Sequence, residues 1–450
     1  MTETYDLLVI GAGMAGIAAA KKCASQGWRV GIVDARPYGG TCALRGCDPK
    51  KILRRGAEII ESARLLRGKG IDDHAMAINW PDLMEYKRGF TGPIPARMEA
   101  DLAHAGVETL HGHARFTGTR QVEIDGAPYE AHRFLIATGA RPRTLSFPGH
   151  EHLIDSTEFL DLETLPARVL FVGGGFISFE FAHLVARAGS TATIIDRGPR
   201  PLKEFDPDLV ERLIDRSSDV GITLMRDSHV TSVEKRGQSY QVTVEHNGVT
   251  ETVDADLVVH GAGRVADIAA LNLEAAEVQW DAQGVHVHGH LQSTTNPAVW
   301  AAGDAAGTVG APLTPVAVSE AKVAASNMIK GTTKVPDYVG IPTAVFTIPE
   351  LVRVGLLEDE ARKQGIDLDI RYTDTGDWYS NYRVGESTAA AKILIDRSRD
   401  LIVGAHLLGP DYGELINTFA LAIKLGLTTR QLKSVTTAYP TTGSDLASLL

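Results

Sequence analysis

The residues best suited to do chemistry are two cysteines that lie close together in the chain. Cys42 and Cys47 occur in the segment GGTCALRGCDPKK, which runs from Gly39 to Lys51. In a cytoplasmic chain, which we expect here, such a pair indicates redox chemistry or metal binding. Two unpaired core cysteines are the alternative. No further Cys or His with metal-ligand spacing lies close in sequence, so we predict no metal site.

The spacing of the two cysteines limits how they can be joined. In a regular helix, residues five apart are rotated by about 140° and separated by a rise of about 7.5 Å. A disulfide needs Cα atoms within about 7 Å, so a Cys42–Cys47 bridge requires a break in the helix, which Gly46 permits. Asp48 and Pro49 are typical of an N-cap and a first helical residue, and we expect that helix to run to about residue 66.

A glycine-rich turn precedes the cysteines. An apolar run, Leu7–Ile10, leads into Gly11, Gly13 and Gly16, then a helical stretch, and a second strand that ends at Asp34. This pattern is typical of a βαβ unit whose glycines let the backbone approach a pyrophosphate at a helix N-terminus. The terminal acid can accept hydrogen bonds from ribose hydroxyls.

The same pattern recurs later in the chain. The apolar run 169–172 leads into Gly173 and Gly175, and the next strand ends at Asp196. In both copies the acid lies 23 positions after the first glycine. Ser178 stands where a third glycine is usual and is small enough for close helix–strand packing. We therefore predict two nucleotide sites.

Short strands and turns follow each unit, at residues 112–138 and 229–263, where Asn247-Gly248 predicts a hairpin. Residues 331–342 are typical of a linker. Beyond it we expect strands at 344–354, 366–375, 391–396 and 401–408 and a helix at 412–425. The predicted fold class is therefore α/β, with two Rossmann-type nucleotide-binding domains carrying β-meanders and a C-terminal α+β domain.

Composition excludes several classes of protein. The 450 residues carry a net charge of −11 and lack a basic tract, which disfavours nucleic acid as a partner. No apolar run reaches the ~20 residues of a membrane span. The N-terminal residues lack the positive region of a signal peptide. Cys23, in an apolar stretch, is expected to be core filler.

The whole chain resembles the pyridine nucleotide–disulfide oxidoreductases, the family of glutathione reductase, dihydrolipoamide dehydrogenase and mercuric reductase. The resemblance rests on residues 39–50, on Ala137-Thr138-Gly139 and on Ala301-Ala302-Gly303-Asp304. It implies FAD in the first βαβ unit, a nicotinamide nucleotide in the second, and a homodimer with a small-molecule electron acceptor. The implied domains are FAD-binding (1–146 and 265–335), NAD(P)-binding (147–264) and dimerisation (336–450).

The resemblance also implies which residues contact the two cofactors. They are Gly11, Gly13, Gly16, Asp34, Gly40, Thr41, Lys50, Ala114, Gly139, Asp304, Thr314, Gly173, Gly175, Phe176, Ile177, Glu180, Asp196, Arg197, Lys203 and Gly263.

By the same resemblance, hydride passes from the nicotinamide to the flavin, and an electron pair then passes to a Cys42–Cys47 disulfide. Cys47 matches the flavin-proximal thiol, and Cys42 matches the thiol that attacks the substrate. Lys50 and Glu180 match a charged pair beside the flavin, and Phe176 takes the place of an aromatic gate. For Glu180 and Phe176, an exposed helical charge and ordinary helix packing are the alternatives.

The C-terminal segment departs from the family. Tyr439 stands where glutathione reductase has its catalytic histidine, Ser444 stands where the orienting glutamate is expected, and Asp445 is one residue away. A tyrosine of pKa about 10 is a poor base near neutral pH, so we expect poor turnover of glutathione disulfide. Mercuric reductase relies on C-terminal cysteines, and this chain has none after Cys47.

The preferred nicotinamide nucleotide depends on the residues after the second acid. Asp196 favours NADH, whereas Arg197 and Lys203 match cations of NADPH-using members, and Arg is well suited to bind a phosphate. A solvated charge cluster is the alternative. We expect NADPH. Three functions fit: a reductase acting through the dithiol, a flavin reductase of quinones, metal ions or oxidants that bypasses it, and a flavin-bound redox sensor.

Overall fold

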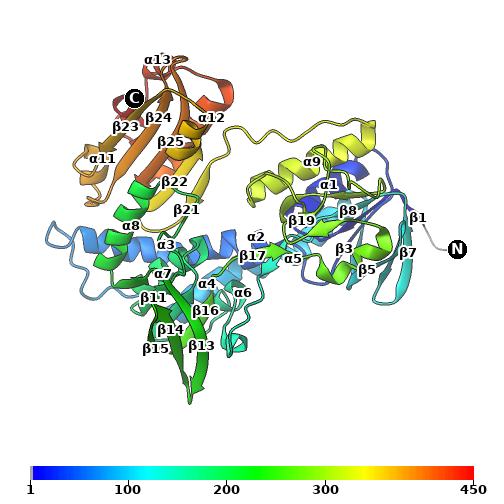
Figure 1. Cartoon of the computed structure of the whole chain (residues 1–450), viewed down its shortest axis with the longest axis horizontal. Coiled ribbons are helices and arrows are strands. Elements are labelled where there is room, and N and C mark those ends of the chain that lie inside the picture. The colour runs from blue at the N-terminus through cyan, green and yellow to red at the C-terminus, as the bar shows by residue number, and fades with distance from the viewer. Residues whose placement is uncertain (1–3) are drawn as a thin grey trace. The chain divides into compact units, whose positions relative to one another are not determined.

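The computed structural model describes residues 4–450, which divide into two compact units (Figure 1). The first unit comprises Met1–Lys51, described from Thr4, with Glu85–Thr144 and Gly263–Tyr338. The second comprises Ile52–Met84, Leu145–Ala262 and Val339–Leu450. The boundary between them falls within the helices α3 (Cys47–Leu65) and α4 (Trp80–Thr91).

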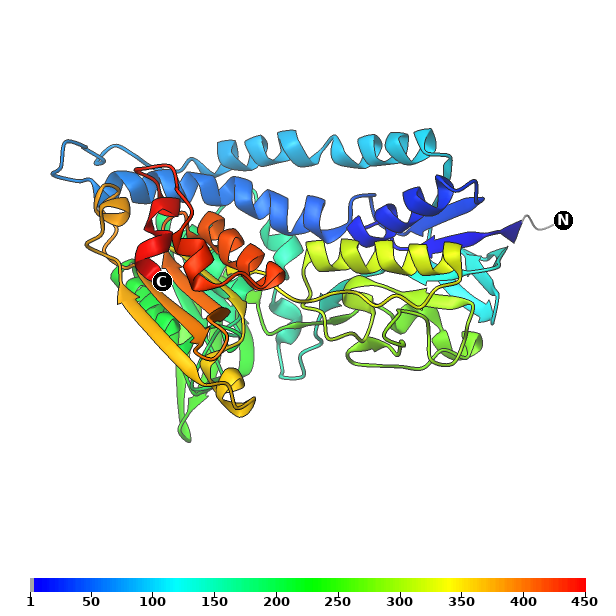
Figure 2. The same ribbon diagram turned by 90° about the horizontal axis from the view of Figure 1, so that it is seen from above.

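A five-stranded parallel sheet forms the centre of the first unit, in the order β20-β8-β2-β3-β4. Its strands are β2 (Leu7–Ile10), β3 (Val30–Asp34), β4 (Val107–His111), β8 (Phe134–Ile136) and β20 (Val299–Ala301). Helices α1 (Met14–Ala24) and α9 (Thr314–Lys330) pack side by side and share a core with its strands (Figure 2). The first predicted βαβ unit is therefore confirmed.

A smaller sheet completes the first unit, in the order β1-β7-β6-β5. Its strands are β1 (Thr4–Tyr5), β5 (Ala114–Gly118), β6 (Gln121–Ile124) and β7 (Ala127–Ala131). The predicted meander at 112–138 is therefore too long, because β8 leaves it and pairs in parallel with β2 and β20. Helix α5 (Ile94–His104) lies in a part of the chain for which we predicted no element.

The second unit contains the second βαβ repeat. Strands β10 (Arg168–Val172) and β11 (Thr191–Ile195) flank α7 (Phe176–Arg187) within the parallel order β12-β11-β10-β16. The outer strands are β12 (Ile222–Met225) and β16 (Leu257–His260), and α8 (Pro207–Asp219) precedes β12. An antiparallel sheet of β13 (Ser228–Arg236), β14 (Ser239–His246) and β15 (Val249–Ala255) confirms the predicted hairpin. The meander predicted to reach 263 ends earlier, because β16 joins the parallel sheet.

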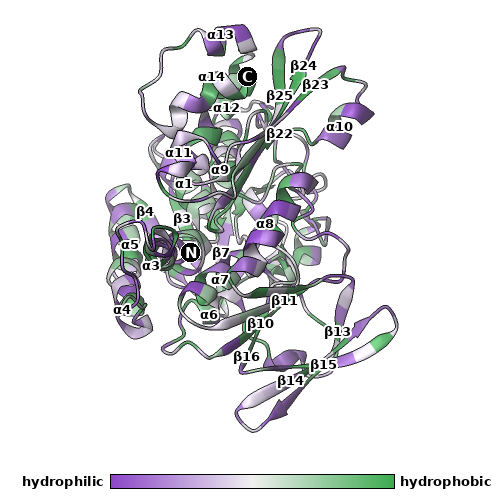
Figure 3. Ribbon diagram, turned by 90° about the vertical axis from the view of Figure 1, so that its left-hand side faces the viewer, coloured by the Kyte–Doolittle hydropathy of each residue, from purple (hydrophilic) through white to green (hydrophobic). Residues whose placement is uncertain are grey.

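The C-terminal part forms a sheet in the order β21-β22-β25-β24-β23, whose central strands are largely hydrophobic (Figure 3). The strand predicted at 344–354 is in fact two antiparallel strands, β21 (Thr343–Val345) and β22 (Glu350–Gly355), because the chain turns at Ile348-Pro349. The other strands, β23 (Leu368–Asp374), β24 (Ala390–Asp396) and β25 (Leu401–Gly409), lie close to their predicted ranges. Helix α12 (Tyr412–Leu425) has the predicted bounds and packs on β22 and β25.

One ion-pair network crosses the interior of the second unit. The Glu61 carboxylate of α3 accepts a hydrogen bond from Arg187 Nε of α7 at 3.0 Å and another from Arg216 of α8. Arg216 also donates to Glu386 at 3.1 Å, and Arg187 donates to the Ile348 carbonyl oxygen at 2.9 Å. All four charged residues are buried. Charges removed from water are tolerated only when paired, so this network fixes α3, α7, α8 and the C-terminal sheet together.

Among the helices that the structure describes, none is long and apolar enough to cross a membrane.

Removal of the central carboxylate tests this network. Glu61→Gln leaves Arg187 and Arg216 without their shared counter-charge, so we expect a loss of about 3–5 kcal/mol in the free energy of unfolding. The control is Glu123→Gln, which breaks the exposed pair with Arg115 and should cost about 0–1 kcal/mol. Urea unfolding followed by circular dichroism measures both, and similar small losses would contradict the structural role.

Candidate active site

The glycines of the first turn are packed as closely as a backbone allows. Gly11, directly after β2, has φ +107°, and a Cβ there would lie 2.4 Å from the Ala137 carbonyl oxygen. A Cβ on Gly16 would lie 1.9 Å from the Gly11 carbonyl oxygen. Asp34 at the end of β3 accepts a hydrogen bond from the Ala12 N–H at 2.8 Å. A side chain at Gly11 or Gly16 would therefore clash with the backbone of this turn.

The cysteine segment lies against this turn. A Cβ on Gly40, which has φ +67°, would lie 2.5 Å from the Gly13 Cα atom. Gly40 begins α2 (Gly40–Arg45), the short helix that carries Cys42, and Thr41 follows it on the exposed side. The structure thus brings the first nucleotide turn and the cysteine segment together.

A break in the helix separates the two thiols. Helix α2 ends before Gly46, and α3 begins with Cys47. The expected break is present, but Asp48 lies inside the first turn of α3 instead of at the N-cap, because the Gly46 carbonyl oxygen already accepts from the Lys50 N–H at 3.1 Å. Cys42 is half-buried and Cys47 is exposed, and both are free thiols. Cys23 is buried, as predicted.

The two thiols differ in acidity. The pKa of Cys47 is lowered to about 6 by a hydrogen bond from Cys42, by the Lys50 charge and by Thr314, which together outweigh desolvation. The same hydrogen bond, with burial, raises the pKa of Cys42. Thr314 begins α9, and its Oγ1 lies 4.0 Å from Cys47 Sγ. The Asp48 carboxylate raises both thiol pKa values. Because the pKa of Cys47 is nevertheless lowered and that of Cys42 is raised, Cys47 is the thiolate of the reduced pair.

Further predicted residues of the first unit lie in its loops. Asp304 is half-buried in the turn Gly303–Ala305, where burial raises its pKa and Arg264 opposes the increase. Glu320 of α9 holds this turn by accepting from the Gly303 N–H at 2.7 Å. Three other predicted cofactor residues are at the start of β5 (Ala114), after β8 (Gly139) and before β17 (Gly263; β17 is Arg264–Ala266).

The second glycine turn has the same close packing. Gly173 has φ +107°, and a Cβ there would lie 2.6 Å from the Gly261 carbonyl oxygen. A Cβ on Gly174 would lie 2.7 Å from Asp196 Cγ, so this glycine also belongs to the turn. It was not among the predicted site residues. The uninterrupted run of three glycines was the signal for it. Ser178 is fully buried against Gly261, which explains why a small residue stands there.

Helix α7 begins at this turn and carries three predicted residues. Gly175 is its N-cap, and Phe176, its first residue, is 48% exposed, whereas Glu180 is buried. Glu180 Oε1 accepts from the Phe346 N–H at 2.8 Å. The alternative interpretation of Glu180 as an exposed helical charge is therefore wrong. Its pairing with Lys50, a residue of the other unit, stays a prediction, as does the contact of Ile177 with a nucleotide.

The cations after β11 lie at the surface. Arg197 and Lys203 are exposed, and Asp196 is buried. The Arg200 guanidinium donates to the Lys203 carbonyl oxygen at 3.0 Å, which fixes the loop between them. Two exposed cations next to a nucleotide turn can bind a phosphate.

The C-terminal segment has an exposed Tyr439, of which 81% is accessible. The side chains of Asp445 and Ser444 make no hydrogen bond with Tyr439. Asp445 accepts a hydrogen bond from Ser380, and Ser444 Oγ donates to the Thr441 carbonyl oxygen at 2.6 Å.

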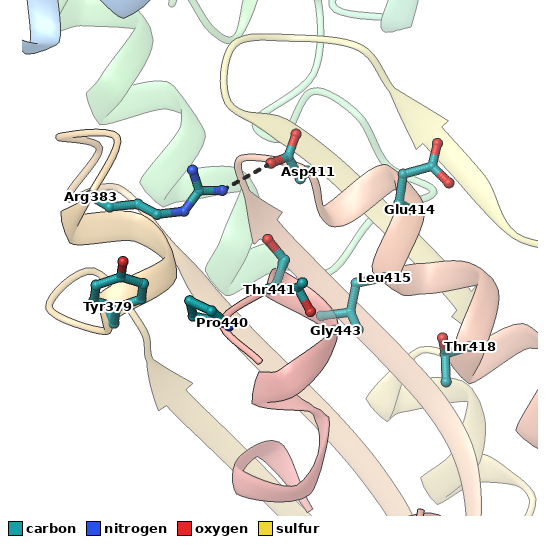
Figure 4. A pocket seen from close by; sticks show the side chains of 10 residues that line it. Tyr379, Arg383, Asp411, Glu414, Leu415, Thr418, Pro440, Thr441 and Gly443 are labelled. Atoms are coloured by element: carbon teal, nitrogen blue, oxygen red, sulfur yellow. Dashed lines mark ion pairs between the residues drawn. The ribbon is translucent and has the colours of Figure 1, made fainter. Parts of the chain in front are cut away.

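An open hollow of about 540 Å³ adjoins this segment (Figure 4). Its lining includes Tyr379, Arg383, Asp411, Glu414 and Thr441. Sequence reasoning missed it, because its residues come from separate segments of the chain.

The chain matches two family models of known proteins. Residues 5–321 match the pyridine nucleotide-disulphide oxidoreductase family, and residues 341–449 match its dimerisation domain. The chain is 31% identical to mercuric reductase of Lysinibacillus sphaericus over 99% of this chain and 82% of that protein. It is 30% identical to glutathione reductase of Burkholderia cepacia, over 99% and 98%. The Cu(II) complex of the HOCl-induced flavoprotein disulfide reductase RclA from Escherichia coli superposes with a TM-score of 0.89 at 25% identity, covering 99% of both chains.

The first glycine turn gives a test of cofactor binding. Gly16→Ala would place a methyl group 1.9 Å from the Gly11 carbonyl oxygen. We expect the purified wild type to be yellow with FAD and the variant to have lost most of it. Gly89→Ala is the control, because a Cβ there meets nothing within 4 Å. Absorbance at the flavin band relative to protein measures the content. A Gly16→Ala protein with full FAD would contradict the assignment.

The acidity of Cys47 gives a second test. In the reduced protein, alkylation of Cys47 by iodoacetamide should rise with pH around a midpoint near 6, because only the thiolate reacts. Asp48→Asn removes a charge that raises the thiol pKa values, so the midpoint should move to lower pH.

The exposed residue Asp72 gives the control for this test, because Asp72→Asn changes the same charge at a residue outside the thiol segment and should leave the midpoint where it is. Mass spectrometry resolves the modified cysteine. A midpoint at the ordinary cysteine pKa, or an upward shift in Asp48→Asn, would show that the electrostatics are misassigned.

Proposed function

Since this chain belongs to the pyridine nucleotide–disulfide oxidoreductases and is a flavoprotein oxidoreductase, we propose that it passes electrons from NADPH through FAD to the Cys42–Cys47 pair and then to a small-molecule acceptor. The observation that carries this proposal is the pair itself. Two thiols lie on either side of a helix break, one with a lowered pKa and the other with a raised pKa. This is the arrangement of a nucleophile that shares one proton with its partner.

The residues of the first unit fit FAD. Gly11, Gly16 and Gly40 form a cradle that any Cβ would fill, and Asp304 supplies a half-buried carboxylate. Bound FAD would supply a two-electron carrier between the nicotinamide and the cysteines. Lys50, in the first turn of α3, supplies a positive charge beside Cys47.

The chain's own thiols can complete a disulfide reduction. The Cys42 sulfur, after giving its proton to Cys47, attacks one acceptor sulfur, which forms a mixed disulfide and releases one thiolate. The Cys47 thiol gives this proton to the departing thiolate, and its sulfur then attacks Cys42. A Cys42–Cys47 disulfide forms and the second acceptor thiolate leaves, so two electrons reach the acceptor.

The missing proton donor restricts the acceptor. Tyr439 replaces a histidine, and Asp445 is held by Ser380. Once the Cys47 proton has gone to the first leaving group, no acid–base group within residues 4–450 is oriented to protonate the second alkyl thiolate. Acceptors whose products leave without a proton suit this site better: activated disulfides or metal ions. Reduction at the flavin alone is the second candidate. The names of two similar proteins, a mercuric reductase and a Cu(II) complex of RclA, favour a metal-ion acceptor for it.

A homodimer is the proposed assembly. Residues 341–449 match the dimerisation domain of the family. By the resemblance to this family, the C-terminal segment would complete the partner's dithiol site, which would place the exposed Tyr439 beside the partner's cysteines.

The acceptor preference can be measured directly. We expect turnover of glutathione disulfide to be ~10²–10⁴-fold below that of an activated aromatic disulfide, the range that a general acid usually contributes. Tyr439→His alone should recover little, because its orienting carboxylate is absent, and Tyr439→His with Ser444→Glu should recover more. Tyr439→Phe is the matched control and should change nothing.

The cysteine dependence of the same assay separates the two candidates. Cys42→Ser and Cys47→Ser should each abolish disulfide reduction by NADPH. Full quinone or metal-ion reduction in both variants would assign those acceptors to the flavin. Glutathione disulfide turnover equal to that of the activated disulfide in the wild type would contradict the role given to Tyr439.

Nucleotide preference tests the surface cations. We propose that Arg197 and Lys203 bind the 2′-phosphate of NADPH, so Arg197→Glu should lower kcat/KM for NADPH at least tenfold more than for NADH, the effect of about 1.4 kcal/mol. Lys235→Glu, an equal charge reversal at another exposed residue of this unit, is the control. Equal losses for both nucleotides, or a wild type that prefers NADH, would instead indicate that Asp196 determines the nucleotide preference.

A further inference from the structure

Three histidines alternate along one short segment of the first unit, His286, His288 and His290, in the sequence GVHVHGHLQ. None of them belongs to the cysteine or nucleotide segments. The rings of His288 and His290 lie parallel, with an angle of 4° between their planes and centroids 5.2 Å apart. His286 is not part of this pair, because its Nε2 lies 3.0 Å from the Asp281 carboxylate.

The backbone that carries the two rings is fixed. A tight turn spans residues 288–291, in which the Leu291 N–H donates to the His288 carbonyl oxygen at 2.7 Å and the His288 N–H donates to the Gln292 carbonyl oxygen at 2.8 Å. The Leu291 side chain is fully buried in the core. Asn327 of α9 donates to the His290 carbonyl oxygen at 3.1 Å. The backbone positions of the two histidines are therefore fixed before any ligand arrives.

The side chain of Gln292 fixes the tautomer of the His290 ring. The Gln292 amide nitrogen donates to the Pro297 carbonyl oxygen at 2.7 Å, so its oxygen faces His290 Nε2 at 3.2 Å. His290 Nε2 must therefore carry the hydrogen, which leaves a lone pair on Nδ1. Histidines that bind metals usually donate their other ring N–H in this way. His288 is exposed, and within residues 4–450 its ring makes no hydrogen bond or ion pair.

We propose that His288 and His290 form a binding site for a divalent late transition-metal ion, with Gln292 as the residue that orients His290. Imidazole nitrogen is a preferred ligand of Ni(II), Cu(II) and Zn(II). With metal–nitrogen bonds of about 2.1 Å, two nitrogens on one ion lie at most ~4 Å apart. Gln292 holds the His290 ring, so the exposed His288 ring is the one that must rotate, starting with its centroid 5.2 Å from that of His290. Water fills the remaining positions, so the site is open to exchange.

Another group of possible ligands, Asp72, Asp73 and His74, must be distinguished from this pair. There the Asp73 carboxylate is already bound by two nitrogens of Arg67, each at 2.6 Å. Its charge is therefore neutralised, and the group contains a single histidine.

Titration of the oxidised holoenzyme with NiCl₂ by calorimetry tests the proposal, because Ni(II) is not reduced by thiols and the cysteines are then joined. We expect one site per chain. Gln292→Leu should weaken it ~10–100-fold, as for other residues that orient a ligand, and His288→Ala or His290→Ala should weaken it more. His286→Ala and His74→Ala are the matched controls and should bind as the wild type does.

Electron paramagnetic resonance of the Cu(II)-loaded oxidised enzyme gives a second readout. The wild type should show two nitrogen ligands, and His288→Ala should show fewer. An unchanged Ni(II) affinity in His288→Ala and His290→Ala, or a spectrum that neither variant alters, would overturn the proposal. Far-ultraviolet circular dichroism checks that each variant is folded.

Discussion

The contact between Gly40 and Gly13 is the constraint on which the site depends. It brings the start of the cysteine helix to the turn between β2 and α1, at a distance that leaves no room for a Cβ. Gly11 and Gly16 impose the same condition on the turn itself. A nucleotide bound at the turn would therefore lie beside the cysteine segment. The absence of a side chain at Gly40 thus allows the two backbone segments to approach closely, and this approach would place a cofactor next to a thiol.

The helix break then determines the electrostatics of the thiols. Because α2 ends at Arg45 and α3 starts at Cys47, one sulfur lies at a helix N-terminus while the other remains half-buried. The Lys50 charge and the N-terminal dipole favour the Cys47 thiolate, and the Asp48 charge opposes it. The result is a pair of thiols with distinct pKa values from two chemically identical residues.

Local sequence signals predicted the parts of the site that are local in the chain. The family, both βαβ units, the break at Gly46 and helix α12 could be predicted, and the family matches confirm the resemblance. The register of helix α3 and the division into β21 and β22 were wrong, because one backbone hydrogen bond or one turn decided them. The Glu61 network and the binding of Glu180 to Phe346 could not be predicted, since they join residues 126 and 166 positions apart. Acceptor chemistry depends on such distant contacts as well.

The most direct measurement of the central claim is an anaerobic electron count. If FAD and the cysteine pair both carry electrons, dithionite titration of the oxidised holoenzyme should consume four electrons per bound flavin. Cys42→Ser and Cys47→Ser, which cannot form the disulfide, should each consume two. A wild type that also takes up only two electrons per flavin would contradict the account, because Cys42 and Cys47 would then stand outside the path of the electrons.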